Sequence, residues 1–355
     1  MKTKRASKGA NNGIFRRGLA VLSIDTEQIW GYLDLTDEVG FKDRYPYVLP
    51  VHDRLLDCLC GAGISATWTV VGALSLSGTL GPQDPRFAGL PQDWTAKTPV
   101  GDEASSPLWY RRSFVQRLCK AQPAQDVGIH GGLSHLIWSN PETSAEVARS
   151  ELNGGIRALK EIEILPRAFV FPRNLVAHLD ILASHGIRCY RGRASSLSEK
   201  LGFNLAGRAV RYAEEVARCT PQPVWPQEVR PGLWSIPASL NLYSMRPAAK
   251  RIAPLRTRVE RVRLGIDAAV RQRGIFHLWF HPENLAEAPW SFPIFEDIVG
   301  ELVKRRSAGD IEILTMNQVV DRLSNDPVEV ANKSSSGIAH NLPTVLQTAS
   351  LQRQT

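Results

Sequence analysis

The sequence predicts an α/β fold, an irregular (β/α) barrel of seven or eight strand–helix units, on three grounds. Short apolar runs alternate with segments of helical period, which is the pattern of parallel βαβ units. Eight such runs lie within about 300 residues, and that number suits one barrel better than two domains. The composition, 43% hydrophobic and 22% charged, is that of a globular protein.

The predicted strands, in chain order, are Leu19–Asp25, Ala66–Gly72, Val127–His130, Arg167–Phe171, Arg188–Arg191, Leu233–Pro237, Ile275–Phe280 and Ile311–Leu314. Two helices between them are well marked: Leu175–Ser184, and Pro141–Ile162 with Asn140 as its N-cap. The stretches Leu80–Pro107 and Arg193–Arg230 are rich in Gly and Pro, and we expect them to be long loops.

We expect three regions: a basic N-terminal extension (1–17), the barrel (18–324) and a disordered tail rich in Ser, Asn and Gln (325–355). No apolar run is long enough to span a bilayer, and the N-terminus lacks the apolar core of a secretory signal. These features indicate a cytoplasmic protein without a transmembrane segment. The five cysteines are odd in number and scattered, so we expect buried free thiols.

The net charge of +8 is concentrated between Arg246 and Arg273, which hold nine Lys or Arg residues. This segment can be a solvated helix face or a surface that attracts phosphate groups, with Arg256, Arg258 and Arg261 as its contacts. No zinc-finger or RNA-recognition motif is present, so nucleic acid is not an expected partner. The oligomeric state is not predicted.

Polar residues stand where several predicted strands end, and in a parallel barrel these ends converge on one face. They are Asp25, Glu27, His130, His135, Arg173 and His281. Taken singly, such a carboxylate can be a helix cap, such a histidine a structural residue, and such an arginine a surface ion-pair partner. Their coincidence at one end of separate strands favours a catalytic site.

Two imidazoles and a carboxylate make a suitable ligand set for a divalent metal, with Zn²⁺ the first choice. Glu27, His130 and His135 supply this set. Asp25 would then take a proton from a water molecule that the metal acidifies, and His281 would donate one to the departing amine. The set therefore predicts hydrolysis of an amide or ester.

Five segments carry a further signal: Ser23–Glu27, Gly61–Gly72, Asp126–His135, Phe169–Asn174 and Phe276–Leu285. In this order they resemble the motifs of the polysaccharide deacetylase family (carbohydrate esterase family four, the NodB-homology type). The resemblance extends from about Gly18 to Leu323. It implies the barrel of the polysaccharide deacetylase type and removal of an acetyl group from an N-acetylated or sometimes O-acetylated sugar.

The resemblance also implies the roles of base, three metal ligands, orienting arginine and acid, in the order Asp25, Glu27, His130, His135, Arg173 and His281. The sequence differs from the common motifs at two of these places. His135 follows His130 by five residues instead of four, with two glycines between them. Arg173 follows its proline, whereas the common motif begins with the arginine.

The Asp-Trp motif that supports the catalytic histidine in the family is not recognisable near Cys189–Arg193. Glu283 and Asp297 are the candidate partners of His281. Trp30 and Trp279 are the aromatic candidates for stacking on a sugar ring, and Asn284 is a further candidate for substrate binding.

The sequence thus predicts a metal-dependent hydrolase that deacetylates a carbohydrate, either a polysaccharide or a lipid- or nucleotide-linked precursor. Two alternatives remain open at this point. One is a related amidohydrolase that acts on a small non-peptide C–N substrate. The other is a non-catalytic carbohydrate-binding relative.

Overall fold

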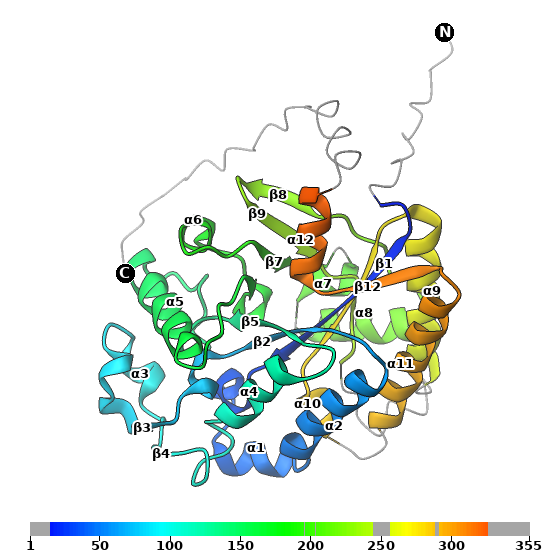
Figure 1. Ribbon diagram of the computed structural model, residues 1–355. Helices are drawn as coiled ribbons and strands as arrows, with labels where there is room; N and C mark the ends of the chain where they lie inside the picture. Colours follow the sequence, from blue (N-terminus) through cyan, green and yellow to red (C-terminus); the bar gives the residue numbers. More distant parts are fainter. Residues whose placement is uncertain (1–14, 195, 203, 244–255, 288–290, 326–355) are drawn as a thin grey trace, which may run out of the picture.

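The computed structural model describes residues 15–194, 196–202, 204–243, 256–287 and 291–325, and within them ten strands form one curled sheet. The sheet order is β10-β11-β1-β2-β5-β6-β7-β9-β8, and β12 pairs with β1. Neighbouring strands are parallel except β8 and β9. The two edge strands are not paired with each other in the described residues, so the sheet is a half-barrel (Figure 1).

The strands of this sheet are β1 (Gly18–Thr26), β2 (Thr67–Val70), β5 (Asp126–His130), β6 (Ala168–Val170), β7 (Cys189–Gly192), β8 (Gln227–Arg230), β9 (Leu233–Pro237), β10 (Leu240–Asn241), β11 (Ile275–Phe280) and β12 (Ile311–Leu314). All eight predicted strands are confirmed. The strands β8 and β10 were not predicted: β8 is exposed along its length, and β10 is only two residues long. Neither therefore shows an apolar run in the sequence.

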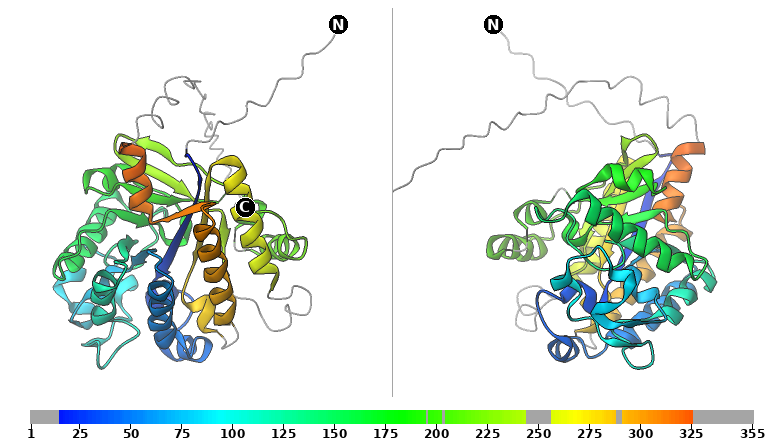
Figure 2. Two further views of the ribbon diagram at one scale, coloured as in Figure 1. Left: turned by 45° about the vertical axis from the view of Figure 1, so that its right-hand side comes forward. Right: turned by 90° about the vertical axis from the view of Figure 1, so that its left-hand side faces the viewer.

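The helices are α1 (Glu38–Arg44), α2 (Val48–Gly61), α3 (Gln92–Thr95), α4 (Arg112–Lys120), α5 (Ala145–Lys160), α6 (Leu179–Ser184), α7 (Leu197–Leu201), α8 (Leu205–Val216), α9 (Arg256–Gln272), α10 (Glu283–Ala286), α11 (Phe292–Ser307) and α12 (Met316–Asn325). The longer ones lie around the outside of the curled sheet (Figure 2). Because helices cover the sheet, β1 and β11 are buried at every residue, as expected for central parallel strands.

Two predicted helices begin later than the sequence indicated. The α5 helix begins at Ala145, where the Ser144 side chain accepts a hydrogen bond from the Val147 N–H and caps the helix. Asn140 was therefore the wrong cap. The α6 helix begins at Leu179, because His178 takes a left-handed conformation with φ 50° and interrupts any helix through it.

The prediction of two long loops was wrong in part. The stretch Leu80–Pro107 holds α3 and β4 (Val100–Asp102), which pairs with β3 (Gly78–Leu80). The stretch Arg193–Arg230 holds α7, α8 and β8. The α8 helix has a regular start, since the Asn204 side chain caps the Gly207 N–H.

All five cysteines are free, as expected, but Cys119 and Cys219 are exposed and only Cys189 is buried. None of the described helices is both long and apolar enough to cross a membrane. Most of the predicted N-terminal extension (1–14) and of the predicted tail (326–355) lies outside the described residues.

Candidate active site

The end of β1 places two carboxylates on one side of the sheet. Asp25 and Glu27 are two residues apart, and alternate residues of a strand face the same way. Both are buried, with 1% and 5% of their surfaces exposed. Glu27 lies against the backbone of Gly31, where an added Cβ would stand 2.2 Å from the Glu27 Cδ. Only glycine leaves room for this carboxylate.

His130 ends the neighbouring strand β5, and a short loop returns His135 to the same place. Gly131 turns the chain with φ 81°, a conformation that favours glycine. The buried Glu151 of α5 accepts hydrogen bonds from the backbone N–H and the hydroxyl of Ser134, each at 2.7 Å. The loop therefore accommodates the five-residue spacing and still brings the two imidazoles together.

The backbone of this loop is held tightly between two other elements. The Gly72 and Ala73 N–H groups donate to the carbonyls of Gly132 and Leu133, both at 2.7 Å. On the other side, a Cβ at Gly155 of α5 would lie 2.5 Å from the carbonyl carbon of Gly132. The helix and the loop thus approach closely enough to require glycine.

Glu27, His130 and His135 form a group that fits a divalent metal. Their donor atoms lie within 4.8 Å of one another. The Nε2 atoms of His130 and His135 lie 3.0 and 2.8 Å from the Glu27 Oε2 atom, and 3.1 Å from each other. The His130 Nδ1 is 2.9 Å from the Val170 carbonyl, which fixes the proton there and leaves Nε2 free to bind a metal.

The electrostatics of this group are those of an ionised carboxylate among imidazoles. Burial alone would raise the pKa of Glu27, but His281, His135 and His130 outweigh it and hold that pKa well below its ordinary value. Burial also lowers the pKa of His135. A negative carboxylate and a neutral imidazole are the forms in which these residues bind zinc.

Asp25 forms a buried, two-pronged ion pair with Arg191. The Nη1 and Nη2 atoms of Arg191 lie 2.7 and 2.6 Å from Oδ1 and Oδ2 of Asp25, and each side chain is 1% exposed. Burial would raise the pKa of Asp25, but Arg191 outweighs this effect and keeps the pKa below its ordinary value. The carboxylate is therefore held ionised and oriented.

Arg173 does not orient Asp25, which is the role that the family resemblance implied for it. Arg173 has φ 57° and its side chain turns to Asp34, with N–O distances of 2.8 and 2.9 Å. Arg191 on β7 pairs with Asp25 instead, and the sequence analysis missed it as a site residue. Its signal was present, since Arg191 ends one of the predicted strands as the other polar site residues do.

A chain of buried polar groups contacts Arg191 and supports the Asp25–Arg191 pair. The Ser23 hydroxyl lies 3.2 Å from Nη1 of Arg191 and 2.9 Å from Nε2 of His277. The His277 Nδ1 faces the Pro237 carbonyl at 3.0 Å, so the proton of the neutral ring belongs there. Burial lowers the pKa of His277 to about 3, which keeps the ring neutral.

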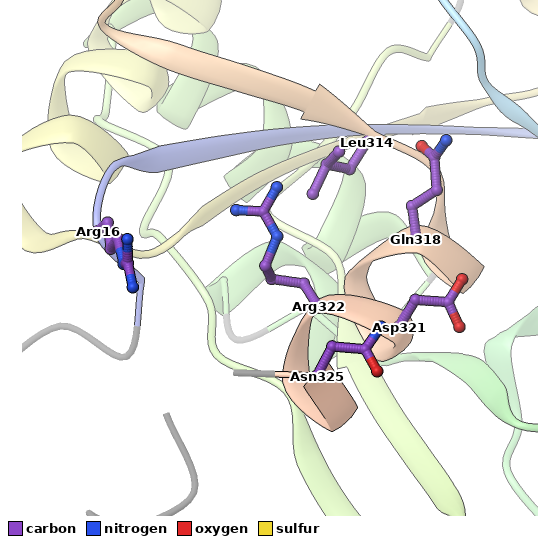
Figure 3. Close-up of a pocket in the computed structure, with 6 residues that line it drawn as sticks. All are labelled: Arg16, Leu314, Gln318, Asp321, Arg322 and Asn325. Atoms are coloured by element: carbon purple, nitrogen blue, oxygen red, sulfur yellow. The ribbon is translucent and has the colours of Figure 1, made fainter. Parts of the chain in front are cut away.

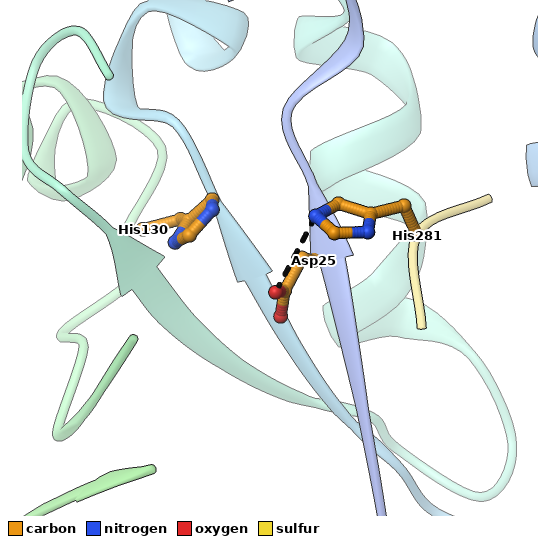
Figure 4. A group of neighbouring side chains, drawn as sticks. All are labelled: Asp25, His130 and His281. Atoms are coloured by element: carbon orange, nitrogen blue, oxygen red, sulfur yellow. Dashed lines mark ion pairs between the residues drawn. The ribbon is translucent and has the colours of Figure 1, made fainter. Parts of the chain in front are cut away.

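His281 follows β11 and lies on the other side of Asp25 from His130 (Figure 4). Its Nε2 lies 3.3 Å from the Glu27 Oε1 and 3.7 Å from the Asp25 Oδ2. The side chain is 22% exposed and lines the cavity described below. Asn284 accepts a hydrogen bond from the His281 backbone N–H at 3.0 Å and so fixes the turn that carries the ring.

Neither predicted partner of His281 contacts it. Asp297 is exposed on α11. Glu283 is fully buried, and its carboxyl oxygens have no hydrogen-bond partner among the described residues. Burial, with the nearby Glu27 charge, raises the pKa of Glu283 well above its ordinary value, which favours the neutral form of this side chain.

A second group of possible metal ligands is Asp25, His130 and His281, whose donor atoms also lie within 4.8 Å of one another. In this arrangement Arg191 already occupies both oxygens of Asp25. The Glu27 group is therefore the better fit for a metal, and Asp25 and His281 lie beside it.

The prediction that Trp30 stacks on a sugar was wrong. Trp30 is fully buried, and its Nε1–H donates to the Trp109 carbonyl at 2.9 Å. Trp279 borders the cavity but is only 2% exposed, and the Arg191 guanidinium lies over its ring at 4.0 Å. Its ring packs the Asp25–Arg191 pair in place. Asn284, by contrast, is partly exposed to the cavity.

One cavity of about 560 Å³ is lined by the polar residues Asp25, Glu27, His130, His135, Arg191, His281 and Asn284. A second cleft lies beside the start of β1 and α12 (Figure 3). Its lining residues are Arg16, Leu314, Gln318, Asp321, Arg322 and Asn325. Asp321 and Arg322 are ion-paired to Arg188 and Glu312. The candidate chemistry belongs to the first cavity.

No protein-family model matches the sequence, and no curated protein is significantly similar to it. The fold, however, has relatives among solved structures. A protein from Mycobacterium smegmatis assigned as a polysaccharide deacetylase superposes with a TM-score of 0.56 and 17% identity, covering 94% of this chain and 96% of that one. A protein from Pseudomonas aeruginosa PAO1 with the same assignment gives a TM-score of 0.55 and 9% identity, over 87% and 91% of the two chains.

The chain has the polysaccharide deacetylase fold. The predicted fold class is therefore confirmed: a curled, mainly parallel sheet forms a half-barrel, as in these two structures. The polysaccharide deacetylase fold explains why the ends of β1, β5 and β11 meet, since the site residues follow the strands at the same edge of the sheet. At these levels of identity the likeness concerns the fold, and the chemistry depends on the residues described above.

Proposed function

We propose that this protein is a metal-dependent hydrolase that removes acetyl groups from N-acetylated sugars, and that it belongs to the polysaccharide deacetylase family. The observation that carries the proposal is the placement of the Glu27, His130 and His135 group beside an arginine-paired Asp25 in one cavity. A binding protein would need neither the buried, ionised Asp25 nor His281.

The residues divide into three roles. Glu27, His130 and His135 hold a divalent cation, zinc by the nitrogen and oxygen donors of the set. Such an ion supplies Lewis acidity, which polarises the acyl carbonyl and lowers the pKa of water. Asp25, held ionised by Arg191, takes the proton of the attacking water as a general base.

His281 is the group placed to protonate the leaving amine. It reaches the cavity from the side opposite His130, and Asn284 fixes its backbone. A general acid is effective when it is held within reach of the leaving nitrogen, and the partly exposed ring meets that requirement at the cavity wall. Trp279 and Arg191 then exclude water from the side of Asp25 that faces the core.

The proposal is tested by measuring acetate release from N-acetylglucosamine oligomers and nucleotide sugars by the zinc-loaded protein. Ammonia and formate release from small amides is measured in parallel. Acetate release supports the proposal. Turnover of the small amides alone would instead favour the amidohydrolase interpretation, and glycan binding without any hydrolysis would favour a binding protein.

The role of Asp25 is tested by Asp25→Asn, which should abolish turnover and leave the zinc content unchanged. The matched control is Asp180→Asn, because Asp180 is exposed on α6, away from the cavity lining. Loss of zinc from the Asp25→Asn protein would show that Asp25 is a metal ligand and would contradict its role as base.

A further inference from the structure

One wall of the active-site cavity carries arginines that the proposed chemistry does not use. Arg208 and Arg211 line the cavity from α8, beside Tyr212 and Tyr243. Arg208 is exposed, whereas Arg211 is 8% exposed. This wall lies where α8 packs against α7 and α9 (Figure 1).

Behind this wall lies a buried cluster of charges that do not balance. Arg211, Arg258 and Arg261 are each at most 8% exposed. Arg261 forms an ion pair with the buried Glu215 at 2.7 Å, and Arg211 lies 3.9 Å from Glu199. Among the ion pairs of the described residues, no carboxylate lies within 4.0 Å of the third guanidinium group, that of Arg258.

Arg258 brings the excess positive charge next to the cavity. Its Nε and one Nη atom are buried without a hydrogen-bond partner among the described residues. Its guanidinium lies 5.0 Å from the ring of Tyr243, and that of Arg211 lies 5.4 Å from the same ring. The sequence prediction of a solvated basic face was therefore wrong for Arg258 and Arg261, because both are buried behind the cavity wall. From there, Arg258 and Arg261 would act on a phosphate in the cavity through their charge and not by direct contact.

An unbalanced buried charge is unfavourable unless an anion approaches it. The cavity is the open side of this cluster, so an anion bound there would offset the excess charge. Arginine in particular matches phosphate, because its planar guanidinium can donate two parallel hydrogen bonds to two oxygens. The aromatic rings of Tyr212 and Tyr243 hold the arginines in place from the side.

We propose that the α8 wall binds a phosphate group of the substrate, so that the sugar deacetylated here is a phosphorylated one. Arg208 and Arg211 donate hydrogen bonds to the phosphate oxygens, and Arg258 contributes its charge from behind. The phosphate can belong to a sugar monophosphate or to a diphosphate-linked carrier, as in a nucleotide sugar. The phosphate site stands on its own geometry, while its role in selecting a substrate rests on the proposed deacetylation.

Anion binding is measured first by titration calorimetry, with inorganic pyrophosphate and metal-free protein so that no bound metal attracts the probe. Arg208→Gln and Arg211→Gln should each weaken binding by about tenfold, the usual scale of a charge-assisted hydrogen bond. The control is Arg149→Gln, since Arg149 is exposed on α5 and outside the cavity lining. Arg208 is exposed, so its substitution should leave folding intact even if that of Arg211 does not. Pyrophosphate binding that is absent, or that Arg208→Gln leaves unchanged, overturns the proposal.

Acetate release then separates the two proposals. The kcat/KM for N-acetylglucosamine 1-phosphate and for UDP-N-acetylglucosamine is compared with that for neutral oligomers. We expect Arg208→Gln to raise KM for the phosphorylated sugars alone. Whichever of the two phosphorylated sugars has the higher kcat/KM shows whether the site prefers a monophosphate or a diphosphate. Efficient turnover of neutral oligomers only would refute the role of the α8 wall in selecting a phosphorylated substrate and leave the deacetylase proposal standing. Arginine-dependent pyrophosphate binding without acetate release from any sugar would support the phosphate site and contradict the deacetylase proposal.

Discussion

The buried ion pair between Asp25 and Arg191 makes a strong prediction about stability. Arg191→Met removes the cation and keeps much of the side-chain volume, so the main effect is an Asp25 carboxylate left buried without its partner. Both side chains are 1% exposed, and breaking such a pair from one side costs about 3–5 kcal/mol. The Ser23 hydroxyl also loses the hydrogen bond from Nη1, which adds to the effect.

The matched control is Arg173→Met, because Arg173 forms its ion pair with Asp34 at the surface. These two side chains are 31% and 39% exposed, and such a pair contributes only about 0–1 kcal/mol. The free energy of unfolding of each variant is measured by urea denaturation. The double variant Asp25→Asn/Arg191→Met should lose less stability than the sum of the two single variants, since neither charge is then left unpaired.

Activity provides a second readout of the same substitution. Burial raises the pKa of Asp25 and Arg191 lowers it, so removing Arg191 should raise the pKa and move the acid limb of the kcat/KM profile to higher pH. Arg173→Met should leave that limb in place. The reasoning is refuted if Arg191→Met is as stable as Arg173→Met, or if its acid limb does not move.

Three further predictions concern the acid, the histidine loop and the metal site. His281→Ala should slow acetate release by about 100-fold or more in steady-state assays, and a near-normal rate would exclude it as the acid. Burial raises the pKa of Glu151 from 4.5 to about 7, so the wild-type protein should lose up to about 3 kcal/mol of stability as pH rises from about 4.5 to 7. The Glu151→Gln variant should lack this loss. Curves of unfolding free energy against pH that run parallel for the wild type and the variant would contradict a raised pKa of Glu151. Gly31→Ala should weaken zinc binding by about 10–100-fold because its Cβ would displace Glu27, whereas Gly61→Ala, whose Cβ meets no atom within 4 Å, should bind zinc normally in a competition titration.

Much of the fold could be predicted because its signals are local. The eight predicted strands appear in the sequence as mainly apolar runs, and β1 and β11 are buried at every residue because helices cover the sheet. The same reasoning located Asp25, Glu27, His130 and His281, which directly follow or end such runs. It also included His135, whose loop depends on two glycines that are visible in the sequence.

The sequence predictions were wrong where contacts between residues far apart in the chain determine the direction of a side chain. Arg173 and Arg191 both stand at strand ends, and only the packing shows that Arg191 points inward to Asp25 while Arg173 turns to Asp34. Trp30 lies close to the site in sequence, but its indole is buried against Trp109. No local pattern distinguishes a tryptophan that packs the core from one that faces a ligand.

The close approach of Gly72, Gly132 and Gly155 has a consequence for metal binding at the proposed site. Two backbone hydrogen bonds and a glycine contact fix the segment that carries His135. The donors of the proposed metal site are thus arranged in advance, and binding of an ion there would require little ordering of the chain. A side chain at Gly155 would push directly on the Gly132 backbone and so move the loop and the His135 imidazole out of position.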